Sequence, residues 1–379
     1  MLIQKFLETH SLSDLEGVGI DYNLFDNGHI IVLNYNQITA QESDPMSREC
    51  RALILSVPNS ITETDIVGKT NIVSRSFCRF FNLGQQNTSI DFSKDIVIFE
   101  KLDGSMINVY NYQDKWYVST RSCWDGSNEV NGFVFKDLFL KCLGIPFDEF
   151  TAKLNAKFTY IMELTAPVNR IVVDYPDFSL RLIGCREIQT GIEKDIRSID
   201  IGLNIPKIYN FNSVQDITNF IDALEDHNFE GFVSLINENG VFHRVKIKSP
   251  KYLIAHRVAT LATCDHHLMD MILQNVDDDM VQYLSDYFKE RLFDIKIKFN
   301  EYLVRSDNLF HEYKGLGRKE FALVILEHKD VLTQHLFNMY TNKAHSTLES
   351  IQKQKKDGVF PRSVLDSILG VLDKGDQNV

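Results

Sequence analysis

Short apolar runs rich in β-branched residues recur through the first 250 residues of the chain. Turn-forming residues separate many of these runs, as at 111–115 and 237–240, so each run predicts a β-strand. The predicted strands are 29–36, 51–57, 95–100, 105–110, 115–120, 158–164, 170–175, 180–185, 231–236 and 241–248. Helical stretches intervene around 131–143 and 213–225. Strands joined mostly by hairpin-length links, with a few helices, predict an α+β fold with largely antiparallel sheets.

The pattern changes after about residue 254, where apolar positions take on helical spacing. Between 281 and 303 they recur every three or four residues, which predicts a helix, and the aspartates at 277–279 favour its N-terminal dipole. Further helices are predicted over 319–340 and 362–372. The chain is long enough for two domains. The predicted domains are 1–254, with the antiparallel sheets, and 255–379, which is all-α.

The composition of the 379-residue chain is that of an ordinary globular enzyme, with 44% hydrophobic and 24% charged residues. Its six cysteines include no C-x-x-C pair, which disfavours a zinc ribbon or a disulfide framework and suits a reducing cytoplasm. No signal-peptide pattern or membrane-spanning run is present, so we expect a cytoplasmic protein with no membrane contact. The net charge of −12 means that a polyanionic partner would need a local basic groove. No protein partner is evident.

One apolar run is interrupted by charge: residues 96–110 read IVIFEKLDGSMINVY. Lys101, Asp103 and Gly104 lie between two predicted strands, and glycine permits backbone shapes that other residues resist. A tight turn with a solvated lysine would explain this segment, and so would a lysine held at a ligand pocket. The K-x-D-G motif alone is too short to decide between them.

Five stretches in fixed order favour the ligand pocket. They are SRECRALIL (47–55), EKLDGSM (100–106), FTYIMELTAPVNRIVVDY (158–175), NFEGFVSLI (228–236) and VKIKSPKY (245–252). Together they resemble the nucleotidyltransferase motifs of covalent ligases, and most closely the RNA ligase 1 family of T-even-like phages, the tRNA-repair ligases. The resemblance implies a nucleotidyltransferase domain, and the family's helical C-terminal domain suits residues 255–379.

The resemblance implies that Lys101 is the catalytic residue, which attacks the α-phosphate of ATP and holds AMP through a phosphoramide bond. An ordinary lysine has a pKa of about 10.4 and is almost wholly protonated at neutral pH, so nearby cations or a metal must favour its neutral form. Lys246 and Lys248 alternate on one predicted strand and point to the same face. We expect this pair to flank Lys101 and to hold the leaving pyrophosphate, although an isolated K-x-K is more typical of a solvated edge strand.

Arginines at the head of the second predicted strand, 51–57, are candidates for phosphate binding, because a guanidinium can donate two hydrogen bonds to phosphate oxygens. Arg51 is expected to do so, whereas a structural ion pair is favoured for Arg48. Arg79 and Arg121 stand where the family usually has lysine. Both arginines keep the positive charge, so we expect both to contact phosphate, although an arginine side chain differs from lysine in its reach and geometry. Phe81 is more typical of a core position than of a base-stacking one.

Two carboxylates are the candidates for ribose and metal binding. Glu163 interrupts the apolar run YIMEL, where an unpaired charge would be costly to bury, so the alternative is an ion pair with Arg170 or Arg186. Glu230 precedes Gly231, where glycine lets the backbone approach a ligand. By resemblance, Glu163 contacts the ribose, Gly104 lies at the nucleotide, and Glu230 helps to hold Mg²⁺, or Mn²⁺, beside the ATP phosphates. Oxygen ligands suit Mg²⁺, but the sequence does not separate the two carboxylate roles.

Two other motifs are weaker. The run CDHH at 264–267, with His256, lacks a second ligand pair at zinc spacing. The run YKGLGRKE at 313–320 follows no strand pattern, which favours a flexible entry into a helix over a phosphate-binding loop. A tRNA contact by the basic residues of that second run, Lys314, Arg318 and Lys319, is a minor expectation.

The function that this resemblance implies is ATP-dependent RNA ligation, in which lysyl-AMP and RNA-adenylate intermediates lead to joined 3′-hydroxyl and 5′-phosphate ends. The implied partners are ATP and RNA, and in particular a tRNA nicked in its anticodon loop. One alternative is a related enzyme that joins DNA or caps mRNA with GMP. Such enzymes commonly append a β-rich barrel, which the helical pattern after residue 277 disfavours. A second alternative is a non-catalytic RNA-binding adaptor.

Overall fold

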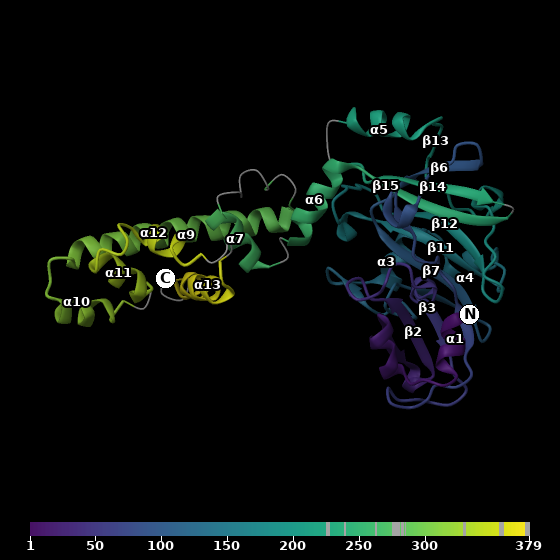
Figure 1. Ribbon diagram of the computed structural model, residues 1–379, viewed down its shortest axis with the longest axis horizontal. Helices are drawn as coiled ribbons and strands as arrows, with labels where there is room; N and C mark the ends of the chain where they lie inside the picture. Colours follow the sequence, from purple (N-terminus) through teal and green to yellow (C-terminus); the bar gives the residue numbers. More distant parts are fainter. Residues whose placement is uncertain are drawn as a thin grey trace. The chain divides into compact units, whose positions relative to one another are not determined.

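In the computed structural model the chain divides into two compact units, Met1–Leu253 and Ile254–Val379 (Figure 1). Each unit has hydrophobic cores of its own. The structure describes residues 1–224, 228–238, 240–261, 264–274, 281, 284, 286–328, 331–355 and 360–375.

The first unit begins with a four-stranded antiparallel sheet. Its strands, in spatial order, are β1 (Ile20–Phe25), β2 (Ile30–Tyr35), β3 (Leu53–Ser56) and β4 (Asn71–Ser74). Alternate residues of β2 enter different cores, because successive side chains of a strand point to opposite faces. Ile31 and Leu33 pack into a core that includes residues of α1 (Leu2–Leu7), while Ile30 and Val32 join a second core with Tyr110. The short helix α2 (Pro45–Glu49) precedes β3 and is capped by the Asp44 carboxylate.

A second four-stranded antiparallel sheet carries the largest core of this unit. Its strands, in spatial order, are β12 (Ser179–Glu187), β11 (Phe158–Thr165), β7 (Ser105–Tyr112) and β8 (Lys115–Ser119). The helices α3 (Phe135–Leu143) and α4 (Phe147–Thr151) pack against it through the phenylalanines Phe139 and Phe150, and the two-residue strands β9 (Glu129–Val130) and β10 (Phe133–Val134) precede α3. Gly144, in the left-handed region with φ of 71°, ends α3.

The third sheet has five strands and positions the candidate site. Its order is β13 (Ile208–Tyr209), β6 (Asp95–Lys101), β14 (Gly231–Glu238), β15 (Val241–Lys248) and β5 (Phe81–Asn82). All pairs are antiparallel except β15 with β5. The amphipathic helix α5 (Val214–Asp222), capped by Ser213, packs Ile217 and Ile221 into the core beneath this sheet. The parallel pair brings the chain around Phe81 beside Lys246.

The prediction of an α+β fold with largely antiparallel sheets is confirmed, and nine of the ten predicted strands are present. The strand predicted over 170–175 is wrong. The backbone N–H groups of Val172 and Val173 donate to the Asp103 carboxylate, at 2.8 and 2.9 Å, and no strand ladder forms there. A tertiary contact to a buried acid therefore determines the backbone conformation of this apolar run.

The second unit is helical in all its described elements. These are α6 (Pro250–Leu261, which begins in the first unit), α7 (Asp265–Gln274), α9 (Asp286–Tyr313), α10 (Arg318–Ile325), α11 (Thr333–Tyr340), α12 (Thr347–Gln352) and α13 (Arg362–Gly375). Leu292, Ile295 and Phe299 of α9 are buried at the predicted helical spacing. The single helix predicted over 319–340 is wrong, because the chain leaves helical geometry between α10 and α11. The acids at 277–279 lie outside the described residues.

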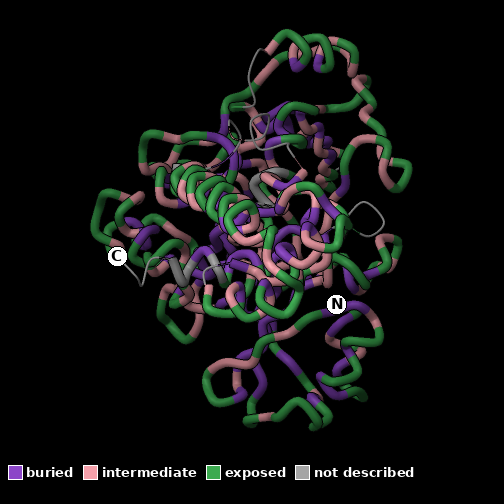
Figure 2. Tube along the Cα trace, turned by 90° about the vertical axis from the view of Figure 1, so that its left-hand side faces the viewer, coloured by how far each residue is buried: buried purple, intermediate pink, exposed green. Residues whose placement is uncertain are grey.

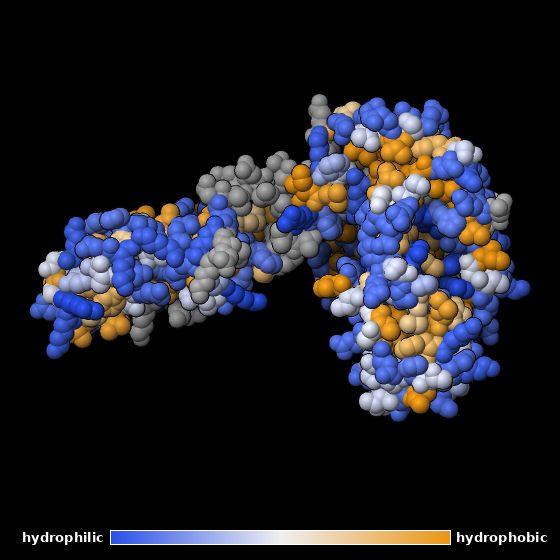
Figure 3. Space-filling model, in the orientation of Figure 1, coloured by the Kyte–Doolittle hydropathy of each residue, from blue (hydrophilic) through white to orange (hydrophobic). Residues whose placement is uncertain are grey.

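Buried, intermediate and exposed positions alternate along the trace, and the outermost loops are mostly exposed (Figure 2). Hydrophobic residues on the visible face of the first unit form separate patches among hydrophilic ones (Figure 3). Among the described residues, no helix combines the length and the apolar character that crossing a bilayer requires.

Candidate active site

Three neighbouring strands bring Lys101 and Lys248 to one carboxylate. Lys101 ends β6 and Lys248 ends β15, and the Cα atoms of both are register partners of Gly231 at the start of β14. Glu230, directly before Gly231, therefore lies between them. The Lys101 Nζ donates to Glu230 Oε2 at 2.8 Å and the Lys248 Nζ lies 3.0 Å from Glu230 Oε1. The Glu230 side chain is 3% exposed, so each of its oxygens is matched with an ammonium group away from solvent.

Gly231 makes this arrangement possible. Its φ is +139°, and a Cβ at this position would lie 2.0 Å from the carbonyl oxygen of Ile247. The sequence predicts that glycine here admits a ligand, but the close neighbour is the backbone of β15. Gly104 behaves similarly, because its Cβ would lie 2.2 Å from the Leu164 oxygen, while its N–H donates to Glu163 Oε1 at 3.2 Å. Both glycines bring strands together at the site.

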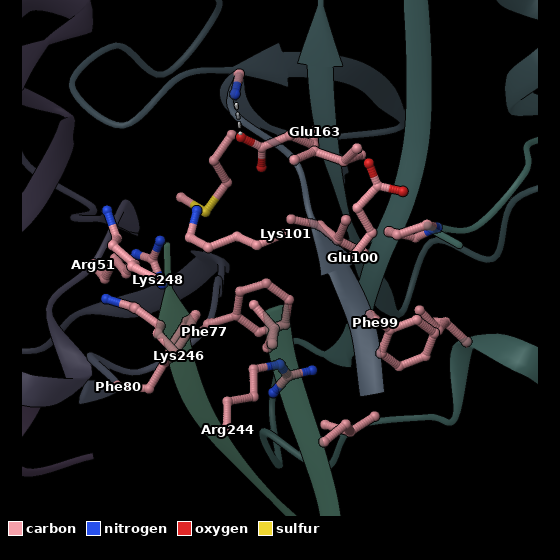
Figure 4. Close-up of a pocket in the computed structure, with 18 residues that line it drawn as sticks. Arg51, Phe77, Phe80, Phe99, Glu100, Lys101, Glu163, Arg244, Lys246 and Lys248 are labelled. Carbon is pink, nitrogen blue, oxygen red and sulfur yellow. Dashed lines mark hydrogen bonds between the residues drawn. The ribbon is translucent and has the colours of Figure 1, made fainter. Parts of the chain in front are cut away.

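A cavity of about 270 Å³ lies beside Lys101 (Figure 4). The candidates lining it include Lys101, Arg51, Gly104, Glu163, Lys246 and Lys248, which the sequence singled out. Apolar residues line another part of it, among them Phe99, Ile183, Ile196, Pro206, Val233 and Leu235. The cavity thus combines a cationic side suited to phosphate groups with an apolar side suited to a flat ring.

Lys246 lies among other positive charges. Burial, together with the charges of Arg51 and Lys101, lowers the pKa of Lys246 to about 7. The Arg51 Cζ lies 5.1 Å and the Lys246 Nζ 4.6 Å from the centroid of the Phe80 ring, so one aromatic face supports two cations. Burial also lowers the pKa of the Arg51 guanidinium. Such a concentration of cations is costly in the free protein and is relieved when an anion binds.

Glu163 lies on β11, across from Met106 of β7. Burial raises the pKa of this carboxyl to about 7, against the opposing charges of Lys101 and Arg51. The arginines considered as its ion-pair partners are engaged elsewhere. Arg170 lies 3.6 Å from Asp174, and Arg186 donates to the carbonyl oxygens of Ser76 and Gly191 at 2.6 and 2.8 Å.

Arg79 and Arg121 form a separate cluster around Tyr35. Their Cζ atoms lie 4.6 and 4.9 Å from the centroid of its ring. Arg79 pairs with Glu42 at 3.2 Å, and Arg121 donates to the Tyr35 carbonyl oxygen at 3.2 Å. The structure thus groups these two arginines with each other rather than along the cavity wall beside Lys101. Phe81 is 4% exposed and packs as a core residue, as expected.

Asp103 has a structural importance that the sequence analysis missed. It is 3% exposed and accepts hydrogen bonds from the N–H groups of Val172 and Val173 and from the Tyr252 hydroxyl, at 2.7 Å. Its own N–H donates to the Tyr175 hydroxyl at 3.0 Å. Asp103 therefore fixes the loop after Lys101 to two distant segments. Its place inside the K-x-D-G motif could have indicated this.

Arg244 was also missed. It lines the cavity, and its guanidinium lies 3.9 Å from the Phe77 ring centroid and 2.6 Å from Glu193. Because side chains alternate along a strand, Arg244 shares the face of Lys246 and Lys248 on β15, and the period of two could have found it. Gly184 leaves room for the Phe77 ring, since a Cβ there would lie 2.3 Å from its Cζ.

The two weaker motifs lie in the second unit. Cys264 Sγ is 3.6 Å from His267 Nδ1, and His266 pairs with Asp366. The described residues contain no group of three or more His, Cys, Asp or Glu side chains arranged to hold a metal. Residues 314–317 connect α9 to α10, so the glycine-containing run leads into a helix.

Comparisons with known proteins agree on one family. A family model described as RNA ligase, of the T4 RNA ligase 1 type, matches residues 49–252. A "Putative bifunctional polynucleotide kinase/RNA ligase" of Autographa californica nuclear polyhedrosis virus is 31% identical over 270 residues, 66% of this chain and 37% of that protein. The "RNA ligase" of Rhodothermus phage RM378 is 26% identical over 63% of this chain and 66% of its own length. The chain thus aligns with just over a third of the viral protein's length and just under two thirds of the phage protein's.

The solved structure of an archaeal ATP-dependent RNA ligase, form 2, aligns over 98% of each chain with a TM-score of 0.47 and 14% identity, too low to support an argument. The family match covers the segment that contains Arg51, Lys101, Glu163, Glu230, Lys246 and Lys248. This chain belongs to the RNA ligase 1 family of T-even-like phages.

Proposed function

We propose that the protein is an ATP-dependent RNA ligase whose covalent nucleophile is Lys101. The observation that carries this proposal is the position of the Lys101 amine, 2.8 Å from a buried carboxylate and on the wall of a cavity that also presents Arg51, Lys246 and Lys248. A lysine amine surrounded by phosphate-binding cations, in a chain of this family, suits nucleotidyl transfer better than simple binding.

In the first step the neutral Lys101 amine attacks the α-phosphorus of ATP. An N–P bond forms, the bond from phosphorus to the pyrophosphate oxygen breaks, and the amine releases its proton. The Lys101 amine is held in an ion pair with Glu230, so it becomes available for attack when this pair is loosened. Arg51, Lys246 and Lys248 then stabilise charge on the phosphoryl oxygens.

Glu230 and Glu163 fit a divalent cation. They are two neighbouring carboxylates, since the charge of Glu230 helps to raise the pKa of Glu163, and Mg²⁺ or Mn²⁺ binds through one or two carboxylates plus substrate phosphates. Glu230 is the better candidate for the metal, because both of its oxygens already hold cationic groups, which a metal ion could replace, and Glu163 is the candidate for the ribose. A bound divalent cation would supply positive charge at the phosphates and would compete with the ammonium groups for Glu230.

The remaining steps use RNA. The RNA 5′-phosphate displaces Lys101 from the adenylate and gives an RNA-adenylate, and an RNA 3′-hydroxyl then displaces AMP and seals the strand. The apolar wall around Phe99 takes the adenine, and Arg79 and Arg121 contribute phosphate contacts from the Tyr35 cluster. We assign nucleotidyl transfer to residues 1–254, and recognition of a nicked tRNA in the cytoplasm to the helical residues 255–379.

A sealing assay tests the proposal. Labelled RNA with 5′-phosphate and 3′-hydroxyl ends should be joined with ATP and Mg²⁺, and neither with GTP nor after Lys101→Arg. Joining of DNA but not RNA, or GMP transfer, would favour the related enzymes instead. If the protein bound RNA but joined no ends with either ATP or GTP, the result would favour a non-catalytic RNA-binding adaptor.

The tRNA assignment needs its own comparison. The full chain and a chain ending at residue 253 should be compared on a tRNA nicked in the anticodon loop and on an unstructured RNA. The shortened chain must first show a cooperative thermal transition. If the shortened chain lost sealing activity equally on both RNAs, or lost none on either RNA, the result would contradict a tRNA-specific function for the helical unit.

A further inference from the structure

A second cavity, of about 500 Å³, adjoins the first. The two share three wall residues, Phe77, Phe80 and Arg244. Figure 4 shows Phe77 between Lys101 and Arg244 at this shared wall. The second cavity is lined further by Phe81 of β5, Arg186 of β12 and His243 of β15, and by Arg48 of α2 and Cys78 in the loop before β5. A molecule that extended beyond the Lys101 cavity past this wall would enter it.

The side chains that line this second cavity carry a net positive charge, even when the arginines that form ion pairs and their partners are left out of the count. Four arginines and two glutamates line it. Glu193 lies 2.6 Å from Arg244, whereas Glu238 has no Lys or Arg partner among the described ion pairs, so its charge is counted against the arginines. Arg79 pairs with Glu42 outside the lining. Within the part of the chain that the structure describes, no carboxylate lies within ion-pair distance of Arg48 or Arg186, so neither charge is neutralised, although the Arg186 guanidinium donates to Gly191, Ser76 and Cys78.

Arg48 is the more informative of these two arginines. Its guanidinium lies 5.2 Å from the centroid of the Phe81 ring, and its backbone carbonyl oxygen accepts from the Arg79 N–H at 2.7 Å. The backbone of Arg48 therefore holds the neighbouring segment, while its side chain contributes an unmatched charge. Arg186 has a structural contribution as well, through hydrogen bonds to Ser76 and Gly191.

We infer that the second cavity is a subsite for the RNA strand, in which Arg48 and Arg186 bind a backbone phosphate next to the reacting end. The inference rests on the proposed function, because the RNA end must reach Lys101. Unpaired guanidiniums select a phosphate, and the half-buried Phe80 ring at the shared wall offers a surface on which the adjoining base stacks. Lys101 and the cations assigned to the ATP phosphates line the first cavity, so the second is assigned to the polynucleotide.

Equilibrium binding of a fluorescent RNA oligonucleotide tests the subsite. Arg48→Ala should weaken binding about tenfold, and the slope of log Kd against log salt should fall by about one, since one phosphate contact is lost. Arg48→Lys, which keeps the positive charge, should restore part of the RNA affinity and part of the salt slope. Lys69→Ala, at an exposed lysine that lines neither cavity, should change neither measurement beyond about twofold. The thermal midpoint of each variant is measured alongside.

Two further measurements, RNA binding with a 5′-hydroxyl oligonucleotide and AMP transfer to the protein, distinguish the possible explanations of the Arg48→Ala result. With a 5′-hydroxyl oligonucleotide, the Arg48→Ala effect disappears if the contact is the terminal phosphate and persists if it is an internal one; both support the subsite. Transfer of AMP to the protein should be unchanged in Arg48→Ala, because that step needs no RNA. Unchanged RNA binding and salt slope, or an equal loss of AMP transfer, would overturn the inference. If wild-type protein bound RNA in this way but never sealed it, the proposed function would fail while the subsite stood.

Discussion

The Lys101 amine lies 2.8 Å from Glu230 Oε2, at a carboxylate that is only 3% exposed. The other oxygen of Glu230 is 3.0 Å from the Lys248 Nζ. The candidate nucleophile is therefore held in an ion pair, with a second lysine positioned on the same acid. This geometry holds the lysine in a defined place, and under the proposed function its release from Glu230 is part of activation.

Substitution of Glu230 tests this pairing. Glu230→Ala leaves two ammonium groups facing each other, so we expect a lower unfolding free energy and a loss of AMP transfer of about 100-fold or more. The stability loss should be below the roughly 3–5 kcal/mol of a fully buried pair, because the Lys101 and Lys248 side chains are 21% and 23% exposed. Urea unfolding and labelling with ATP measure the two effects.

A double variant separates stability from chemistry at Glu230. Adding Lys248→Met to Glu230→Ala removes one of the facing charges and should recover part of the stability without recovering AMP transfer. Glu42→Gln, which breaks the more exposed pair with Arg79, is the matched control and should cost less than about 1 kcal/mol. Recovery of transfer in the double variant would contradict the proposed metal-binding contribution of Glu230.

Lys246→Met should stabilise the free protein while it weakens catalysis. The pKa of Lys246 falls from 10.5 to about 7, so the folded protein binds this proton less tightly than the unfolded chain does. The resulting destabilisation is fully present below about pH 7 and fades as the pH rises toward 10.5. The midpoint of Lys246→Met should therefore exceed that of wild type most at pH 7 and progressively less at higher pH. Scanning calorimetry from pH 6.5 to pH 9 measures this, with exposed Lys94→Met as control.

A Lys246→Met variant that is less stable than wild type at pH 7, or a difference that does not change with pH, would show that the cation is not destabilised in the fold. AMP transfer by this variant should fall about 100-fold, since one charge that stabilises the phosphoryl oxygens is lost.

Gly231→Ala tests whether the site depends on the close approach of β14 and β15. The new Cβ would lie 2.0 Å from the Ile247 oxygen at a φ of +139°, so we expect a cost of at least about 1–3 kcal/mol and a shift of Lys248 from Glu230. Gly17→Ala is the control, because a Cβ at Gly17 would have no neighbouring atom within 4 Å. Thermal midpoints give the result, and equal midpoints for the two variants would refute this explanation of Gly231.

Asp103→Asn should be tolerated better than Asp103→Ala. An asparagine can keep its oxygen toward the Val172 and Val173 N–H groups and donate from its amide to the Tyr252 hydroxyl, whereas alanine offers these two N–H groups no acceptor. The unfolding free energy and the rate of AMP transfer should therefore both be highest in wild type, lower in Asp103→Asn and lowest in Asp103→Ala. The same loss for both variants would mean that the negative charge, rather than the hydrogen bonds, is what the loop requires.

The sequence predicted local features well where local patterns determine the structure. The alternation in VFHRVKIK predicted that Lys246 and Lys248 share one face of the strand. The same alternation puts Arg244 on that face, but the sequence could not predict that Arg244 contacts Glu193 and Phe77, which belong to other segments. The strand predicted at 170–175 failed because Asp103, far away in the chain, binds its N–H groups. The apolar spacing over 319–340 continues across the gap between α10 and α11, so periodicity could not reveal the break. The grouping of Arg79 with Arg121 depends on Tyr35, a third segment.

The most direct test of the central claim is the intact mass of the protein after incubation with ATP and Mg²⁺, followed by peptide mapping. The account predicts a gain of one AMP, mapped to Lys101, that disappears in Lys101→Arg and persists in the exposed-site control Lys115→Arg. Absence of the adduct in folded wild-type protein, or an adduct that remains in Lys101→Arg, would contradict it.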